Sequence, residues 1–252
     1  MTHTSYAGLK NRIVLISGGA TGIGAAMVRA FAAQQARVAF LDIDTIAGEA
    51  LVRELASEGA PLFVPCDLLD IDALRDAMAQ VHAELGDAAV LVNNAANDTR
   101  QILSEVTPAE FDWTIGVNLK HVFFAAQAVV PQMQARGGGS IINMSSIAWI
   151  RGMPTLPVYA AAKAAIVGFT NSLARLVGPD RIRVNAIAPG MVITERQRRL
   201  WFQDEQKIAE GRARQAIPDA VTPDDIARLA LFLASDDSQR ITRQCFQVDG
   251  GL

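Results

Sequence analysis

Short apolar runs rich in valine and isoleucine recur along the chain and alternate with stretches of helical period. Six such runs cover residues 12–17, 37–42, 61–66, 88–93, 140–145 and 181–187. Runs that are apolar at successive positions, rather than at alternate ones, are typical of strands buried on both faces. Between two of them, apolar residues at 71, 74, 78, 81 and 85 follow in steps of three or four, which places them on one helix face. The alternation predicts a parallel sheet with helices on both sides.

Two helix starts carry the same signal. Thr107 precedes a proline and, three residues on, Glu110. Thr222 and Asp225 repeat this arrangement of a capping hydroxyl, a proline at the first helical position and a carboxylate that reaches back. No linker rich in proline, glycine or serine and no internal repeat divides the chain. We therefore predict a single domain over residues 1–252.

Composition narrows the class of protein. Half of the residues are hydrophobic and 19% are charged, which is typical of a globular chain. A net charge of -3 and the lack of a long basic run argue against nucleic acid as a partner. The two cysteines, Cys66 and Cys245, lie in separate apolar segments, and the three histidines have no metal-ligand spacing. We therefore expect neither a disulfide framework nor a metal site.

The hydropathy pattern also bears on location. No run of about 18 apolar residues occurs, and residues 1–12 contain no apolar core of signal-peptide length. We therefore expect a cytoplasmic protein with no membrane partner. The one basic cluster, at 195–201, is expected to be a solvated helix face.

A glycine-rich turn follows the first predicted strand and precedes a helix. Its glycines include Gly18, Gly22 and Gly24. The order of strand, turn and helix points backbone N–H groups and the positive helix end at an anion, usually a pyrophosphate. The second strand ends at Asp42, eighteen residues past Gly24, where a carboxylate accepts from adenosine ribose hydroxyls and repels a 2′-phosphate. The pattern favours NAD over NADP, the alternative being an ordinary tight connection with Asp42 as a helix cap.

Tyr159 and Lys163 stand four residues apart in the helix-compatible stretch 157–165. Residues i and i+4 share a helix face, so the ammonium lies beside whatever the phenol meets. The spacing leaves two interpretations open. One is a paired site, and the other is a partly buried tyrosine whose neighbouring lysine extends to water.

Eight motifs occur in order along nearly the whole chain. They are SGGATGIG (17–24), CDLLD (66–70), NNAA (93–96), VNLK (117–120), NMSS (143–146), YAAAK (159–163), APGMVIT (188–194) and VDGG (248–251). With these motifs the chain resembles the short-chain dehydrogenase/reductase family. The resemblance implies an α/β fold, a single doubly wound Rossmann domain with a seven-stranded parallel sheet, whose last strand would be 244–248. It also implies a homotetramer built on paired long helices.

The resemblance further implies roles for individual residues. Tyr159 resembles the catalytic acid/base and Lys163 its partner. Ser146 resembles the hydroxyl that polarises the reacting oxygen, and Asn118 the residue that holds a water of the proton relay. Because positive charge stabilises a phenolate, Lys163 and the positive nicotinamide ring are both expected to lower the pKa of Tyr159. The expected NAD-binding residues are Gly18, Thr21, Gly22, Ile23, Gly24, Asp42, Asp67, Leu68, Asn94, Ala95, Tyr159, Lys163, Pro189, Gly190, Val192 and Thr194.

Three positions depart from the family pattern. Ser17 stands where the family usually has threonine, Ala96 where it has glycine, and Arg243 where a glycine is common. Ala96 is expected to narrow the space beside the cofactor.

Segments 93–100, 145–149 and 189–201 resemble the branch of the family that oxidises free aldoses such as xylose or arabinose at C1. We therefore expect a polyol substrate, a pentose or 6-deoxyhexose, that is oxidised to its lactone. The expected substrate-binding residues are Asn97, Asp98, Arg100, Ser146, Trp149 and Tyr159. The alternative for this set is that Asp98 pairs with Arg100 and that Trp149 belongs to the core.

Other activities stay open on the sequence. One is a dehydrogenase of another sugar, or of a keto-deoxy sugar acid, at a secondary carbinol. The carboxylate of such an acid would be bound by Arg100, Arg151 or Arg196. A carbonyl reductase of the ketoacyl type is disfavoured by Asp42, because such reductases usually use NADPH. A catalytically silent Rossmann module is disfavoured by the complete set of catalytic residues.

Overall fold

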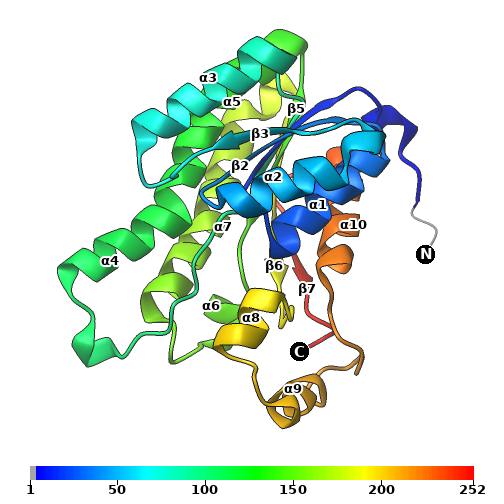
Figure 1. Ribbon diagram of the computed structural model, residues 1–252. Coiled ribbons are helices and arrows are strands. Elements are labelled where there is room, and N and C mark those ends of the chain that lie inside the picture. The colour runs from blue at the N-terminus through cyan, green and yellow to red at the C-terminus, as the bar shows by residue number, and fades with distance from the viewer. Residues whose placement is uncertain (1–3) are drawn as a thin grey trace.

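Seven parallel strands form one sheet in the computed structural model, which describes residues 4–252 (Figure 1). The strands lie in the order β3-β2-β1-β4-β5-β6-β7. Their bounds are β1 Ile13–Ser17, β2 Arg37–Asp42, β3 Leu62–Pro65, β4 Val90–Asn93, β5 Gly139–Met144, β6 Ile182–Pro189 and β7 Cys245–Val248. Each predicted run matches an observed strand to within two residues, so the predicted fold class is confirmed. Residues 1–3, part of the N-terminal stretch considered for an export signal, lie outside the described residues.

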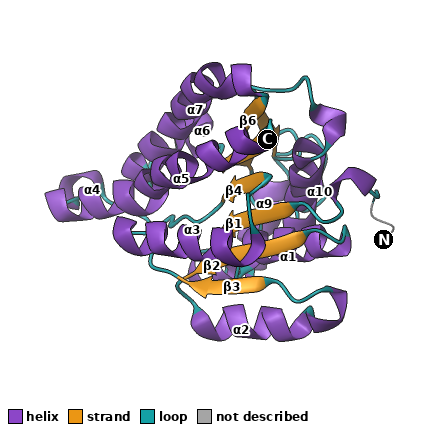
Figure 2. Cartoon of the chain, turned by 90° about the horizontal axis from the view of Figure 1, so that it is seen from above, coloured by secondary structure: helices purple, strands orange, loops and turns teal. Residues whose placement is uncertain are grey.

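Helices cover both faces of this sheet (Figure 2). They are α1 Gly22–Ala33, α2 Thr45–Glu54, α3 Ile71–Leu85, α4 Pro108–Ile115, α5 His121–Arg136, α6 Ala148–Arg151, α7 Pro157–Val177, α8 Glu195–Leu200, α9 Glu205–Arg212 and α10 Pro223–Ala234. Over residues 4–252, none of these helices has the length and apolar character needed to cross a bilayer.

The sheet separates two hydrophobic cores. Val14 and Ile16 of β1 pack with α1, α2 and α10, whereas Ile13 and Leu15 pack with α3, α5 and α7. Successive side chains of a strand point to opposite faces, so a strand between two cores must be apolar at every position. Burial of each large apolar side chain stabilises the fold by roughly 1.5–3 kcal/mol. For this reason the sequence shows the strands as continuous apolar runs.

The strand order reverses beside β1. β1 pairs with β2 on one side and with β4 on the other. The connections that follow β1 and β4 therefore leave the carboxyl edge of the sheet in different directions. Such a switch point opens a crevice in which α/β proteins bind ligands.

The two predicted helix starts are confirmed. At α4, Thr107 Oγ1 accepts from the backbone N–H of Glu110 at 3.2 Å, and the Glu110 carboxylate accepts from the Thr107 N–H at 2.8 Å. At α10, the Asp225 carboxylate accepts from the Thr222 N–H at 2.8 Å. These contacts satisfy N–H groups that the first helical turn leaves without intrahelical partners.

A π-helical turn, Gly116–Lys120, joins α4 to α5. A π-turn displaces the backbone hydrogen bonds of a helix by one residue and is frequent at functional sites. Here it holds Asn118, which is fully buried.

Candidate active site

A large cavity opens at the carboxyl edge of the sheet. Its volume is about 2030 Å³, well above the roughly 300–1,000 Å³ of a typical small-ligand pocket. It therefore has room for a dinucleotide and a second molecule. The predicted site residues that line it are Gly18, Thr21, Gly22, Ile23, Gly24, Asp42, Asp67, Leu68, Asn94, Ala95, Asn97, Asp98, Arg100, Ser146, Tyr159, Lys163, Pro189, Gly190, Val192 and Thr194. Two predicted site residues, Asn118 and Trp149, are not part of this lining within the described chain.

The glycine turn between β1 and α1 is folded too tightly for side chains. Gly18 has a φ of +66°, and a Cβ atom on it would lie 2.7 Å from Ala95 Cα. A Cβ atom on Gly24 would lie 1.8 Å from the carbonyl oxygen of Gly18. α1 begins at Gly22, and the side chain of its N-cap residue, Thr21, makes no capping hydrogen bond. The N–H groups of the first helical turn are therefore left uncapped by this side chain, beside the cavity.

Ser17 fastens the glycine turn to the loop after β4. Its hydroxyl oxygen accepts from the backbone N–H groups of Asn94, at 3.0 Å, and Ala95, at 3.3 Å. The Asn94 side-chain amide donates in turn to the carbonyl of Gly18 at 2.7 Å. Serine therefore supplies the hydroxyl at this position, although threonine was expected from the family pattern.

Asp42 ends β2, lines the cavity and braces the same turn. One carboxylate oxygen accepts from the N–H of Ala20 at 2.9 Å, and the other accepts from the N–H of Asp44 at 3.0 Å. A carboxylate oxygen can accept two hydrogen bonds, so both oxygens retain acceptor capacity.

Tyr159 and Lys163 lie on α7, and Ser146 lies in the turn after β5. The Lys163 side chain is only 1% exposed, and its Nζ donates to the carbonyl of Met144 at 2.8 Å. Nζ lies 5.6 Å from the centre of the Tyr159 ring. The interpretation in which the lysine extends to water is therefore wrong, and the two side chains form a pair.

The pKa values of this pair differ from the expectation. Burial raises the pKa of Tyr159 to about 12, while its hydrogen bond with Ser146 and the charges of Arg100 and Arg196 act to lower it. Burial also lowers the pKa of Lys163 to about 7. In this geometry burial outweighs the groups that lower the Tyr159 pKa, and the lowering expected from Lys163 together with a bound nicotinamide ring stays a prediction.

His121 lies beneath the same region and is fully buried. Its Nε2 is 3.2 Å from the carbonyl oxygen of Ala95, and a carbonyl only accepts, so the imidazole hydrogen belongs on Nε2. Burial, together with the nearby Lys163 charge, lowers the pKa of His121 to about 4. A neutral imidazole therefore holds the backbone of the loop that lines the cavity. The sequence showed this histidine only as part of a helical pattern.

Asn118 anchors the loop after β4 through its side chain. Its side-chain oxygen accepts from the N–H of Asn97 at 3.0 Å. Its side-chain nitrogen donates to the carbonyls of Asn97 and Thr114, each at 2.9 Å. These bonds use the side-chain amide to anchor the loop after β4, and the predicted role of Asn118 in holding a water stays a prediction.

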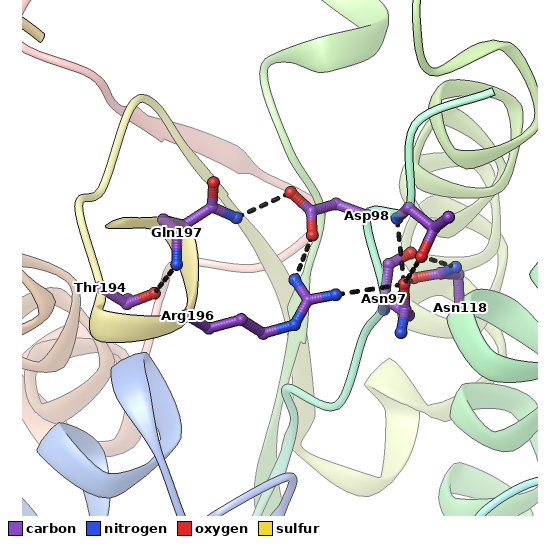
Figure 3. Close-up of polar contacts among 7 residues, drawn as sticks. Asn97, Asp98, Asn118, Thr194, Arg196 and Gln197 are labelled. Carbon is purple, nitrogen blue, oxygen red and sulfur yellow. Dashed lines mark hydrogen bonds and ion pairs between the residues drawn. The ribbon is translucent and has the colours of Figure 1, made fainter. Parts of the chain in front are cut away.

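Asp98 pairs with residues of α8 rather than with Arg100 (Figure 3). Arg196 donates to one carboxylate oxygen, and the side-chain amide of Gln197 donates to the other at 2.7 Å. Burial acts to raise the pKa of Asp98, but the hydrogen bonds from Gln197 and Arg196 and the charges of Arg196 and Arg100 outweigh it, so the pKa is lowered. Arg100 instead lies over the ring of Trp201, with 5.1 Å between its guanidinium carbon and the ring centre. The predicted Asp98–Arg100 alternative is wrong.

Trp149 does not form the predicted wall for a sugar. Its side chain is 37% exposed, and its Nε1 donates to Ser145 Oγ at 3.2 Å. Besides Tyr159, the aromatic residues Phe202 and Trp113 line the cavity. Their sequence context gave no sign of this, because neither lies in a motif. Gln197 was also missed, although it lies within the 189–201 segment.

Known proteins resemble this chain over its full length. Residues 18–252 match the protein family described as enoyl-(acyl carrier protein) reductase. A probable galactose dehydrogenase of Rhizobium meliloti is 50% identical over 99% of this chain and 98% of its own length. A D-xylose 1-dehydrogenase of Caulobacter vibrioides is 45% identical over 100% and 99%. The solved L-sorbose reductase of Gluconobacter frateurii, in complex with NADPH and L-sorbose, is 26% identical with a TM-score of 0.91 over 98% of both chains.

The fold, the glycine turn and the Ser146, Tyr159 and Lys163 cluster agree with these similarities. A solved short-chain dehydrogenase/reductase of Serratia marcescens also matches, at 31% identity over 97% of this chain. The chain is therefore an oxidoreductase that belongs to the short-chain dehydrogenase/reductase family.

Proposed function

We propose that this single-domain enzyme oxidises a free aldose, a pentose or 6-deoxyhexose, at C1 to its lactone with NAD. The observation that carries the proposal is a polar loop directly after β4. Asn97, Asp98 and Arg100 of this loop line the same cavity as Ser146 and Tyr159. The amide of Asn97 and the guanidinium of Arg100 offer donors and acceptors for adjacent hydroxyls, and Asp98, which pairs with Arg196 and Gln197, holds further polar groups at the same wall. The names of the galactose and xylose dehydrogenases, at 50% and 45% identity, support the substrate class.

The residues of the cavity fit a nicotinamide dinucleotide. The glycine turn packs its backbone tightly against itself and the loop after β4, which brings the start of α1, left uncapped by the Thr21 side chain, to the cavity. Asp42 places carboxylate oxygens with spare acceptor capacity at the end of β2. These features support NAD, because the carboxylate would accept from ribose hydroxyls and repel the phosphate of NADP. When bound, NAD would accept the hydride from the substrate carbon.

The protein groups would then handle the proton. Ser146 would donate to the substrate oxygen and hold it beside Tyr159, which would take the hydroxyl proton as general base. The raised pKa of Tyr159 means that the phenolate forms mainly when positive charge gathers near it. Arg100 and Arg196 supply positive charge that acts to lower the Tyr159 pKa, and the hydrogen bond of Lys163 to Met144 fixes the amine below the ring.

A second candidate function is the oxidation of a keto-deoxy sugar acid at a secondary carbinol. Among the described residues, Arg196 pairs with Asp98 and Arg151 lies 4.0 Å from Asp249, whereas Arg100 has no carboxylate partner within ion-pair distance. Arg100 would therefore be the residue that binds the acid group. A carbonyl reductase of the ketoacyl type receives less support, because Asp42 opposes NADPH.

A substrate screen tests the proposal. We would measure reduction of NAD with arabinose, xylose, fucose, galactose, sugar acids and aliphatic alcohols, and identify the product by mass spectrometry and NMR. A lactone or its aldonic acid from an aldose supports the proposal. Turnover of a sugar acid alone, or a product with an unoxidised anomeric carbon, would replace it with the second candidate.

We also propose that the enzyme is a homotetramer. Phe111, Trp113 and Phe123 on α4 and α5, and Leu176 on α7, are exposed apolar side chains of the long helices. Exposed apolar groups on adjoining elements mark protein interfaces. Sedimentation analysis of the full chain and of a Phe123→Glu variant tests this, with dissociation of the variant as the expected result.

A further inference from the structure

Asp98 joins two segments that are far apart in the sequence. It lies in the loop after β4, its side chain is 16% exposed, and both carboxylate oxygens accept from residues of α8 (Figure 3). Arg196 Nη2 also lies 3.4 Å from Asn97 Oδ1. The carboxylate therefore connects one wall of the cavity to another.

Packing alone would hold α8 weakly. The helix spans six residues, Glu195–Leu200, and none of them is buried. Such short helices are not stable by themselves in water. Its N-cap contact, from Gln197 N–H to Thr194 Oγ1 at 3.2 Å, lies within the segment and does not attach it to the rest of the fold. The position of α8 must then depend on contacts such as those of Asp98.

The same loop also reaches the other end of α8. Arg100 lies over the ring of Trp201, the C-cap residue of the helix. Asp98 thus holds the first turn of α8 and Arg100 holds its end. Arg196, Gln197 and Thr194 line the cavity, so whatever fixes the helix also fixes the shape of that wall.

We propose that Asp98 is a positioning residue that sets substrate specificity by holding α8 against the cavity through Arg196 and Gln197. The inference rests on the proposed function for the substrate, a sugar, but not for the contact itself. When Asp98 holds α8, the cavity wall formed by this helix lies close to the substrate, and its polar side chains can hydrogen-bond to particular sugar hydroxyls. Without Asp98, α8 moves away, so the enzyme binds its best sugar less tightly and distinguishes it less well from larger ones.

The proton transfer should be affected less than substrate binding, because Asp98 acts to raise the Tyr159 pKa and Arg196 acts to lower it, so their effects oppose each other. Ser146 lies in the turn after β5, and Tyr159 and Lys163 lie on α7; within residues 4–252 none of them makes a hydrogen bond to α8. Loss of the contacts between Asp98 and α8 should therefore raise KM more than it lowers kcat. Loss of charge-assisted hydrogen bonds of this kind corresponds to roughly a tenfold to hundredfold change in binding.

The first test measures the contact without using activity. Hydrogen exchange of the full chain would be compared for the parent, Asp98→Ala and Arg196→Met. Both variants should exchange faster in peptides that cover residues 195–201 and remain unchanged in the strands. Arg198→Met is the matched control, because Arg198 lies on the same helix but pairs with the exposed Glu205; it should leave exchange unchanged. Unaltered exchange in Asp98→Ala would overturn the proposal.

The second test uses the sugars that the screen identifies as substrates. Asp98→Ala should raise KM for the best sugar by about tenfold or more, with a smaller change in kcat, and should narrow the preference over a larger sugar. The double variant Asp98→Ala/Arg196→Met should raise KM no more than either single variant does, because each substitution already removes the same Asp98–Arg196 contact. Additive losses, or a raised KM with unchanged exchange in α8, would mean that Asp98 binds the sugar directly. If no aldose is turned over, the proposed function fails, while the exchange experiment still decides whether Asp98 holds α8.

Discussion

Replacement of Lys163 by methionine is expected to stabilise the cofactor-free protein near neutral pH. The ammonium is buried, and its pKa falls from 10.5 to about 7. Since one pKa unit corresponds to about 1.4 kcal/mol, the burial of the charged form costs roughly 5 kcal/mol. A lowered lysine pKa means that this cost is complete below pH 7, declines as the pH rises and disappears above pH 10.5.

Because the cost depends on how much of the lysine is protonated in the folded and unfolded states, it differs at each pH. The cost is about 4 kcal/mol at pH 7, about 3 at pH 8.5 and about 1 at pH 10. Methionine removes it but leaves the Met144 carbonyl without its donor from Nζ, which costs about 1–3 kcal/mol at every pH. Lys163→Met should therefore gain roughly 1–3 kcal/mol at pH 7 and change by about 0 to -2 kcal/mol at pH 10.

Urea denaturation followed by circular dichroism, at one protein concentration and at pH 7, 8.5 and 10, measures these differences. The pH-dependent part, about 3 kcal/mol between pH 7 and 10, does not depend on the value of the lost hydrogen bond. Lys10→Met, at an exposed position, is the control and should show no such trend. If the stability difference between Lys163→Met and the parent is equal at all three pH values, the lowered pKa of the buried Lys163 is refuted.

Four further predictions concern the cofactor and the proton. Tyr159→Phe should bind NAD normally but lose about a hundredfold or more in kcat, and the parent rate should rise steadily to pH 10 because the Tyr159 pKa is raised. Asp42→Asn should lower kcat/KM with NAD and raise it with NADP. Gly24→Ala should abolish NAD binding by calorimetry, because its Cβ would collide with the Gly18 carbonyl. His121→Leu should lower the free energy of unfolding by about 1–3 kcal/mol and raise KM for NAD, with His121→Asn as the partial rescue.

Each of these has an outcome that contradicts it. Normal turnover by Tyr159→Phe would exclude Tyr159 as the general base. A flat pH profile of the parent rate, with chemistry rate-limiting, would exclude it as well. Equal use of NAD and NADP by the parent enzyme would exclude charge selection by Asp42. Unchanged NAD affinity in Gly24→Ala or His121→Leu would show that the loop geometry is not needed for the dinucleotide.

The elements that the sequence predicts well are those whose cause is local. A strand between two cores must be apolar at every position, so β1 and β4 were visible as runs. The glycine turn was visible because close backbone approach excludes side chains, as the Gly24 contact with the Gly18 carbonyl shows. Asp42 was found in the same way, since its distance along the chain from Gly24 follows from one strand and one helix.

Pairings across the fold were not predictable in this way. Asp98 and Arg196 are 98 residues apart, and nothing in either segment shows that α8 folds back over the loop after β4. The nearby Arg100 was the natural partner by sequence, but it lies over Trp201 instead. The side-chain bonds of Asn118 to Asn97 are likewise not visible in the sequence, because they depend on how the π-turn meets that loop.

For Tyr159 and Lys163, the spacing in the sequence predicts the contact, whereas the surroundings in the fold decide the protonation states. Residues four apart on a helix are neighbours whatever surrounds them, so the sequence could predict their contact. It could not predict protonation, because burial moves the pKa of a phenol up and that of an amine down, and both shifts appear here. Near neutral pH the buried Lys163 ammonium costs the fold more than its hydrogen bond to Met144 contributes. The presence of a lysine at this position is therefore better explained by the reaction than by stability.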